Sequence, residues 1–101
     1  MSENKTLLVI TSIINKENME ELQSYLENIM PVFVQNGGTP VGRYKTIEQL
    51  AGEQGPETVA IFQFANAEAI KGMVNGEAFK GLAESRAKAF SKLNMMICGE
   101  M

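Results

Sequence analysis

The 101-residue chain contains no His, no Asp and no Trp, and Cys98 is its single cysteine. These absences exclude a Ser-His-Asp triad, a histidine metal site, an axial histidine ligand for haem and an aspartate-based EF-hand loop. We therefore expect no bound metal and no cofactor. Because a lone cysteine cannot form an internal disulfide, a reducing compartment is favoured, and we expect a cytoplasmic protein.

Basic charge and long apolar runs are also scarce. Nine Lys and Arg residues stand against twelve Glu residues, which gives a net charge of -3, and the basic residues are scattered along the chain. A nucleic-acid or anionic membrane surface is bound through clustered basic residues, which this chain lacks. No stretch approaches the roughly 20 apolar residues of a bilayer-spanning helix. We expect neither nucleic acid nor a membrane as a partner.

Two short apolar segments are the main positive feature of the sequence. With 45% hydrophobic residues, the composition is that of a globular protein, and the length fits one domain over residues 1–101. Residues 6–14 are rich in β-branched side chains and predict a strand, and residues 57–64 predict another. Both segments are apolar on both alternating faces, so both faces of the sheet should be covered.

A helical pattern follows the first strand. Apolar residues recur there at spacings of three and four, namely Met19, Leu22, Leu26, Ile29 and Phe33. Asn18 with Glu21 predicts a capping box, and Asn15 is a competing cap. The apolar stripe continues beyond Pro31, so we expect a kink there rather than a helix end. Asn-Gly-Gly at 36–38 predicts the helix stop.

The second half of the chain completes a recognisable order. Residues 39–51 predict a strand in which Gly42 marks a bulge or a close backbone approach. The short loop 52–56 joins it to the strand at 57–64. Asn66 should cap a short helix, a second helical piece should span 77–92, and 93–99 should form the last strand. The order predicts an α+β, ferredoxin-like βαββαβ domain, a four-stranded antiparallel sheet with its helices on one face.

Helices on one face leave the other apolar face of that sheet exposed, which monomers rarely tolerate. Covering about five side chains per subunit would contribute roughly 2 kcal/mol each. Association costs about 4–15 kcal/mol, so a dimer remains favourable. We expect a homodimer formed sheet to sheet about a two-fold axis. The alternative is that a terminus or the second-strand region folds over the sheet.

From Leu26 onward the chain resembles a small bacterial family, domain of unknown function 1330. The resemblance rests on Pro31, the Asn-Gly-Gly turn at 36–38, VAIFQFANAEA at 59–69, VNGEAFKGLAESR at 74–86 and Cys-Gly-Glu at 98–100. The resemblance covers nearly the whole chain and rests on the order and spacing of these sequence segments rather than on any one of them.

The family in turn is similar to the dimeric α/β-barrel superfamily, which includes cofactor-free monooxygenases, lactone isomerases and dehydratases. This resemblance implies a ferredoxin-like protomer and a dimer whose two sheets close into a barrel. It implies no particular function. Family members often carry an aromatic residue in the loop between the second and third strands, whereas the loop here reads Glu-Gln-Gly-Pro at 53–56. Related enzymes often use His, Asp or Trp, none of which this chain has.

Four residues are candidate ligand-binding residues. Arg86 lies on the apolar stripe of the second helical piece and either binds a ligand carboxylate or is held by a Glu or a backbone carbonyl. Arg43 and Tyr44 either reach a cleft mouth or are solvated strand residues or dimer contacts. Tyr25 lies beside the helix stripe and needs a hydroxyl partner if buried. Arg43, Tyr44 and Arg86 together predict a pocket between sheet and helices for an anionic or carbonyl-bearing molecule.

The sequence identifies no catalytic residue. Glu48 and Glu53 are candidate general bases without a fixed geometry, and Cys98, in an apolar strand without a His, is expected to be a core thiol. Three functions stay open. They are a cofactor-free enzyme relative, monooxygenase- or isomerase-like, acting on a small organic molecule; a non-catalytic binding module; and a structural homodimer. A mostly apolar cavity would favour the first two, and a filled core the third.

Overall fold

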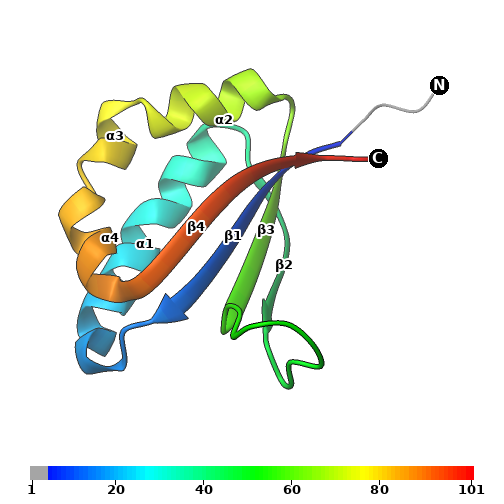
Figure 1. Cartoon of the computed structure of the whole chain (residues 1–101). Coiled ribbons are helices and arrows are strands. Elements are labelled where there is room, and N and C mark those ends of the chain that lie inside the picture. The colour runs from blue at the N-terminus through cyan, green and yellow to red at the C-terminus, as the bar shows by residue number, and fades with distance from the viewer. Residues whose placement is uncertain (1–4) are drawn as a thin grey trace.

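The computed structural model describes residues 5–101 and consists of one sheet and one helical layer (Figure 1). In chain order its elements are β1 (Thr6–Ile14), the 3-10 helix η1 (Lys16–Asn18), α1 (Met19–Gln35), β2 (Thr39–Lys45), β3 (Thr58–Phe64), α2 (Ala67–Val74), α3 (Glu77–Lys80), α4 (Ala83–Ala89) and β4 (Phe90–Gly99). The predicted order of strand, helix, strand, strand, broken helix and strand is confirmed. In residues 5–101, no helix has the length and apolar character needed to cross a bilayer.

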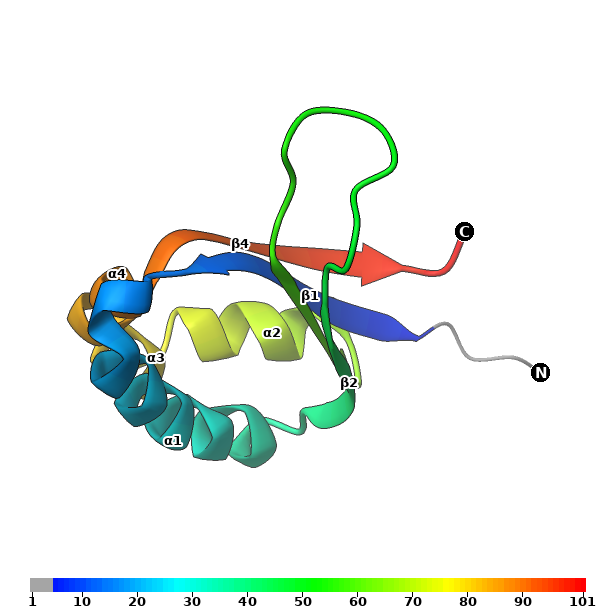
Figure 2. The same cartoon turned by 90° about the horizontal axis from the view of Figure 1, so that it is seen from below.

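The four strands form one antiparallel sheet in the order β2-β3-β1-β4. The strand richest in β-branched residues, β1, is central and pairs with both β3 and β4, a pleated position that suits such side chains. All helices lie on one side of this sheet (Figure 2). This is the ferredoxin-like arrangement that the sequence predicts.

Strand register assigns each side chain to one of two faces. On the helix side Leu8 lies opposite Phe62, and both are almost fully buried. On the other side, which we call the open face, Val9 lies between Ile61 of β3 and Met96 of β4. The open face of β1, β3 and β4 is chiefly apolar, formed by Leu7, Val9, Ile13, Val59, Ile61, Met96 and Cys98 with Thr11, Gln63, Asn94 and Lys92. The two-faced apolar pattern of the sequence therefore survives in the fold.

The predicted capping box at the start of α1 is wrong. Asn15, the competing cap, accepts a hydrogen bond from the Glu17 amide and begins η1, while the Asn18 side chain donates to the carbonyl of Lys88 instead. The α1 helix continues through Pro31 as expected. It ends at Gln35 with Asn36 as its C-cap, and Gly37 then adopts φ +89, the left-handed conformation that glycine tolerates best.

The second helical region is shorter and more divided than its sequence pattern predicts. Asn66 caps α2 as expected, since its side-chain oxygen accepts from the Ala69 amide at 2.8 Å. The expected helix over 77–92 instead breaks into α3 and α4, and β4 begins at Phe90 rather than at 93. Phe90 pairs with Ile14 across a register shift, so pairing with β1 extends β4 into residues whose local pattern is helical.

The β2–β3 connection also differs from the prediction. β2 ends at Lys45, so the loop spans 46–57 rather than 52–56. The Gln49 side chain organises it, accepting from the Gly55 amide and donating to the carbonyls of Ala51 and Glu53. The loop rises on the open-face side of the sheet (Figure 2) and leaves Ile47 and Leu50 almost wholly exposed. The expected bulge in β2 is present between Pro40 and Gly42.

Candidate functional site

A cavity of about 460 Å³ lies between α1 and the sheet. From α1 it is lined by Leu22, Tyr25, Leu26, Ile29, Met30 and Phe33. From the strands it is lined by Ile10, Ser12, Ile14, Arg43, Tyr44, Lys45, Thr58, Val59, Ala60, Phe62, Phe90, Leu93 and Met95. Its volume falls within the range of small-molecule sites in proteins.

Aromatic contacts hold the apolar wall of the cavity. Phe33 of α1 packs on Phe62 of β3 with ring centroids 4.7 Å apart, and Tyr25 meets Phe90 edge to face at 5.6 Å. These pairs fix α1 over β1, β3 and the start of β4. The edge strand β2 has exposed residues at every position except Gly42, so the cavity is bordered there by a strand that the helices leave exposed.

The end of the cavity nearest the 46–57 loop is polar. Ser12, the one buried polar side chain among the described residues, exchanges a hydrogen bond with the Thr58 hydroxyl on the neighbouring strand. On β2, Lys45 lies opposite Thr58 and Arg43 lies opposite Ala60, which places both cations on the helix-facing side of the edge strand. Of the lining residues, two are cationic and none is acidic.

Arg43 and Tyr44 thus both border the predicted pocket, but in different ways. Arg43 shares the helix-facing side with Ala60. Tyr44 lies opposite Val59, and its ring covers Gly42, where it would leave no space for a Cβ. The Tyr44 side chain is therefore packed along the edge strand toward the open face, and its part in the cavity is at the border.

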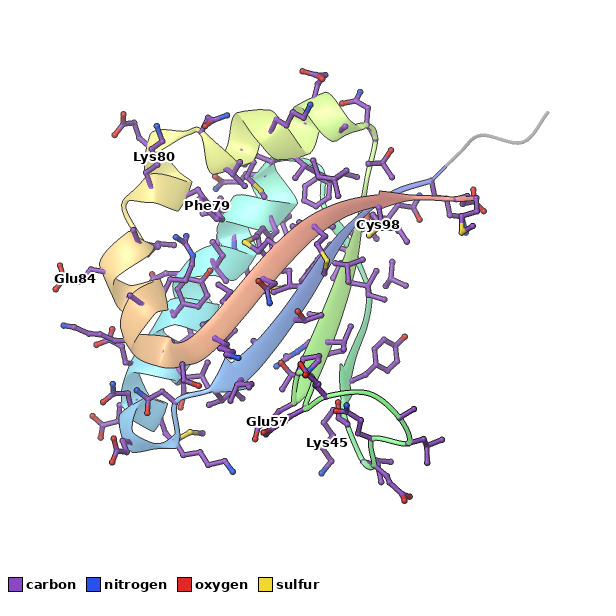
Figure 3. All side chains as sticks on the ribbon, in the orientation of Figure 1. Lys45, Glu57, Phe79, Lys80, Glu84 and Cys98 are labelled. Carbon is purple, nitrogen blue, oxygen red and sulfur yellow. The ribbon has the colours of Figure 1, made fainter. Side chains whose placement is uncertain are left out.

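Arg86 does not line the cavity. Its guanidinium lies 3.9 Å from the centroid of the Phe79 ring and 5.4 Å from that of Tyr25. Nε donates to the Tyr25 hydroxyl at 3.0 Å, and Nη2 donates to the Phe79 carbonyl at 2.9 Å. Figure 3 shows Phe79 directed from α3 toward this interior position. Arg86 thus joins α1, α3 and α4, and its role as a ligand contact stays a prediction.

Tyr25 connects that arginine to the cavity wall. Its side chain is 4% exposed and its hydroxyl has the partner that burial requires. Burial raises the pKa of Tyr25 above its ordinary value of 10.0, because the phenolate loses solvation, while the hydrogen bond and charge of Arg86 act in the opposite direction. Tyr25 therefore stays a neutral phenol at neutral pH.

The remaining candidates lie away from the cavity. Glu48 and Glu53 are exposed in the 46–57 loop, and neither lines the cavity. Cys98 is half-buried and pairs with Leu7 on the open face, so it is not the core thiol that its apolar strand predicts. Sequence reasoning missed Ser12, Thr58 and Lys45. No local motif marks them, since they meet only through the pairing of three strands.

The fold is shared with several solved structures. A protein of unknown function from Rhodopseudomonas palustris superimposes with a TM-score of 0.81 at 15% identity, covering 99% of this chain and 85% of that one. A dabb family protein with a ferredoxin-like fold from Mesorhizobium loti gives 0.70 at 10% identity, covering 98% and 99%. A candidate antibiotic biosynthesis monooxygenase from Nitrosomonas europaea gives 0.65 at 7% identity, covering 95% and 98%. A comparison with curated proteins gives no match.

These likenesses establish the class, an α+β protein with a ferredoxin-like fold. Residues 6–101 match the family described as Domain of unknown function (DUF1330). The chain belongs to that family, as the short sequence segments that it shares with the family predict.

Proposed function

We propose that this protein binds a small organic molecule in the cavity between α1 and the sheet, and that it does so in the cytoplasm. The cavity itself carries the proposal. A core of this size normally closes to crystal-like density, so an apolar space of about 460 Å³ bordered by an exposed edge strand is suited to an occupant. A purely structural unit would need no such space.

Binding is better supported than turnover. No Glu or Cys lines the cavity in the described part of the chain, and its ionisable residues are Tyr25, Arg43, Tyr44 and Lys45. General acid–base catalysis needs a group that exchanges a proton near the working pH, and the pKa of Tyr25 is raised further from it. The fold shared with a candidate monooxygenase keeps a cofactor-free, monooxygenase- or isomerase-like enzyme as the second proposal.

We further propose that the protein is a homodimer formed through the open face. Seven apolar side chains of β1, β3 and β4 share that face, and Met96 is 42% exposed in the isolated chain. The 46–57 loop rises on the same side with Ile47 93% and Leu50 88% exposed (Figure 2). Apolar surface of this extent and continuity suits a second copy of the same face about a two-fold axis.

Thermal-shift screening with small carboxylates, phenols and lactones tests the cavity, comparing the wild type with Ala60→Phe. Ala60 lines the cavity, so a phenyl group there should fill it and abolish any ligand-induced rise in Tm. Ala87→Phe, at an exposed position of α4, is the matched control and should keep the rise. If no compound shifts the wild type, or if Ala60→Phe responds as the wild type does, the binding proposal fails. Mass analysis of the incubated ligand separates binding from turnover.

Sedimentation velocity tests the dimer. The wild type should sediment as a dimer at micromolar concentration, and Val9→Asp, which places a charge at the centre of the open face, should sediment as a monomer. Met19→Asp introduces the same charge at an exposed apolar position on the helix layer and should leave the dimer intact. A monomeric wild type would refute the assembly while leaving the cavity proposal standing.

A further inference from the structure

At the polar end of the cavity, polar side chains of three neighbouring strands lie opposite one another. Lys45 of β2 lies opposite Thr58 of β3, which lies opposite Ser12 of β1. Side chains directly opposite one another in an antiparallel sheet have Cβ atoms about 5 Å apart. Three polar side chains thus stand in one row across three strands, which we call the polar row. The next row inward, beginning at Arg43, continues with Ala60 and Ile10 and is apolar beyond the arginine.

The two hydroxyls of the polar row, Ser12 and Thr58, have two O–H donors between them, and the hydrogen bond that joins them uses only one. Each hydroxyl has a single O–H donor, and in the Ser12–Thr58 pair one of them donates to the other. Among residues 5–101 neither hydroxyl has a second hydrogen-bond partner, so the remaining O–H can donate to a group inside the cavity. Two hydroxyls that share a hydrogen bond in a half-buried position therefore offer a ready donor to an incoming acceptor.

The charged residues that line the cavity beside that donor are both positive. In residues 5–101 the ion pairs are Lys71–Glu68 and Lys88–Glu84, so Lys45 and Arg43 are engaged in neither. Lys45 and Glu57 both lie at the loop end of the sheet (Figure 3), yet they form no ion pair. Glu57 is not part of the cavity lining, which at this end offers an anion two cations and no carboxylate.

We propose that the polar row together with Arg43 binds the oxyanion head of an apolar monocarboxylic acid, whose hydrocarbon body occupies the space under α1. This rests on the proposed binding function and names the ligand class for the same cavity. The head would accept from the free hydroxyl and pair with Lys45 and Arg43. The body would contact the apolar wall formed by Leu26, Ile29, Phe33 and Phe62. A neutral alcohol of equal length would fill the same wall and leave both cations without a partner.

Calorimetric titration with four probes of one chain length tests the class: octanoate, 1-octanol, octylamine and octyl phosphate. Octanoate should bind the wild type about tenfold more tightly than octanol, which corresponds to about 1.4 kcal/mol. Octylamine should bind more weakly than octanol, because it brings a third positive charge. Octyl phosphate binding more tightly than octanoate would overturn the carboxylate assignment in favour of a phosphate head.

Variants of the polar row locate the head. Lys45→Met and Arg43→Met should each remove most of the octanoate preference and leave octanol affinity unchanged. The double variant Ser12→Ala/Thr58→Val, which removes both hydroxyls, should weaken octanoate about threefold. Lys80→Met removes an exposed cation from α3, far from Lys45 (Figure 3), and should change nothing. Lys45→Glu should reverse the preference so that octylamine binds better than octanoate.

The outcomes separate the two proposals. Equal affinity for octanoate and octanol, both lost in Ala60→Phe, would refute the acid class and leave the cavity as the binding site. Binding of any probe that Ala60→Phe does not weaken would refute the cavity itself. An octanoate preference that survives Lys45→Glu would place the head away from the polar row and overturn the assignment. Circular dichroism of every variant confirms that the fold is retained.

Discussion

The two faces of the sheet carry the same kind of apolar side chain but differ in how far those side chains are buried. Phe62 and Leu8 on the helix side are 3% and 1% exposed, whereas their neighbours Ile61 and Val9 on the open face are only half-buried. The two faces differ because all the helices lie on one side of the sheet (Figure 2). Hydrophobic strands determine that a face must be covered, and the connections between strands determine which face the chain itself covers.

The largest expected effect contrasts adjacent residues on opposite faces. Phe62→Ala should lower the free energy of unfolding by about 3–5 kcal/mol, because it opens a hole against Phe33 and Leu8. Ile61→Ala should cost about 1 kcal/mol in dilute protein, where its face is open. Urea unfolding at two protein concentrations measures both.

A concentration dependence sharpens that contrast. If the open face is buried between two copies, the cost of Ile61→Ala grows with protein concentration and that of Phe62→Ala does not. If both substitutions lower the free energy of unfolding equally and at every protein concentration, the two faces do not differ in burial.

The next effect concerns how the helix layer is held over its face. Tyr25→Phe removes the hydroxyl that accepts from Arg86 and should cost about 1.5–3 kcal/mol at neutral pH. It should also alter the response to alkali. The pKa of Tyr25 in the folded protein lies above 10.0, so the unfolded chain loses this proton first, and stability falls as the pH rises beyond 10.0.

Urea unfolding at pH 8, 9.5 and 11 tests this dependence. The wild type should lose stability between the last two values, and Tyr25→Phe should lose less, since that part of the slope belongs to the phenol. Tyr44→Phe is the control, because Tyr44 is exposed, and should behave as the wild type does. An identical alkaline slope in wild type and Tyr25→Phe would show that the buried phenol does not set it.

The smallest effect is local to the helix layer. Asn66→Ala removes the cap that accepts from the Ala69 amide and should cost about 1 kcal/mol. Asn28→Ala, at an exposed position inside α1, should be near neutral, since Ala is the better helix former. Thermal unfolding compares the two, and a larger loss for Asn28→Ala than for Asn66→Ala would contradict the assigned cap.

Much of the fold follows from local patterns. β1 has the predicted bounds, Asn66 caps its helix, Gly37 follows the C-cap of α1, and the bulge in β2 lies between Pro40 and Gly42. The strand bounds, the helix cap and the helix end depend on residues within a few positions of one another, whereas the bulge also depends on pairing with β3. The errors occur where distant contacts decide. Asn18 reaches Lys88 instead of capping α1, and Phe90 joins a strand because Ile14 pairs with it.

The candidate site was predictable to a smaller degree. Arg43 and Tyr44 lie at the cavity border, and their part in ligand binding stays a prediction. The buried Tyr25 has the partner its hydroxyl requires. Arg86 was singled out because a charge on an apolar stripe needs an explanation, and the structure supplies one in Tyr25 and Phe79 without a ligand. Ser12, Thr58 and Lys45 carried no such signal, because each is an ordinary strand residue until register aligns them.

The sequence by itself determined the class of fold and the presence of two apolar sheet faces, because alternation and helical periodicity are properties of neighbouring residues. Tertiary structure alone decided where a cavity remains and which side chains meet at its polar end. Both depend on strand register, which pairs Lys45 with Thr58, 13 positions away, and Ser12 with Thr58, 46 positions away. They also depend on where α1 leaves β2 uncovered. Strand register and helix placement are set by the packing of the whole chain, and no local segment of the sequence determines them.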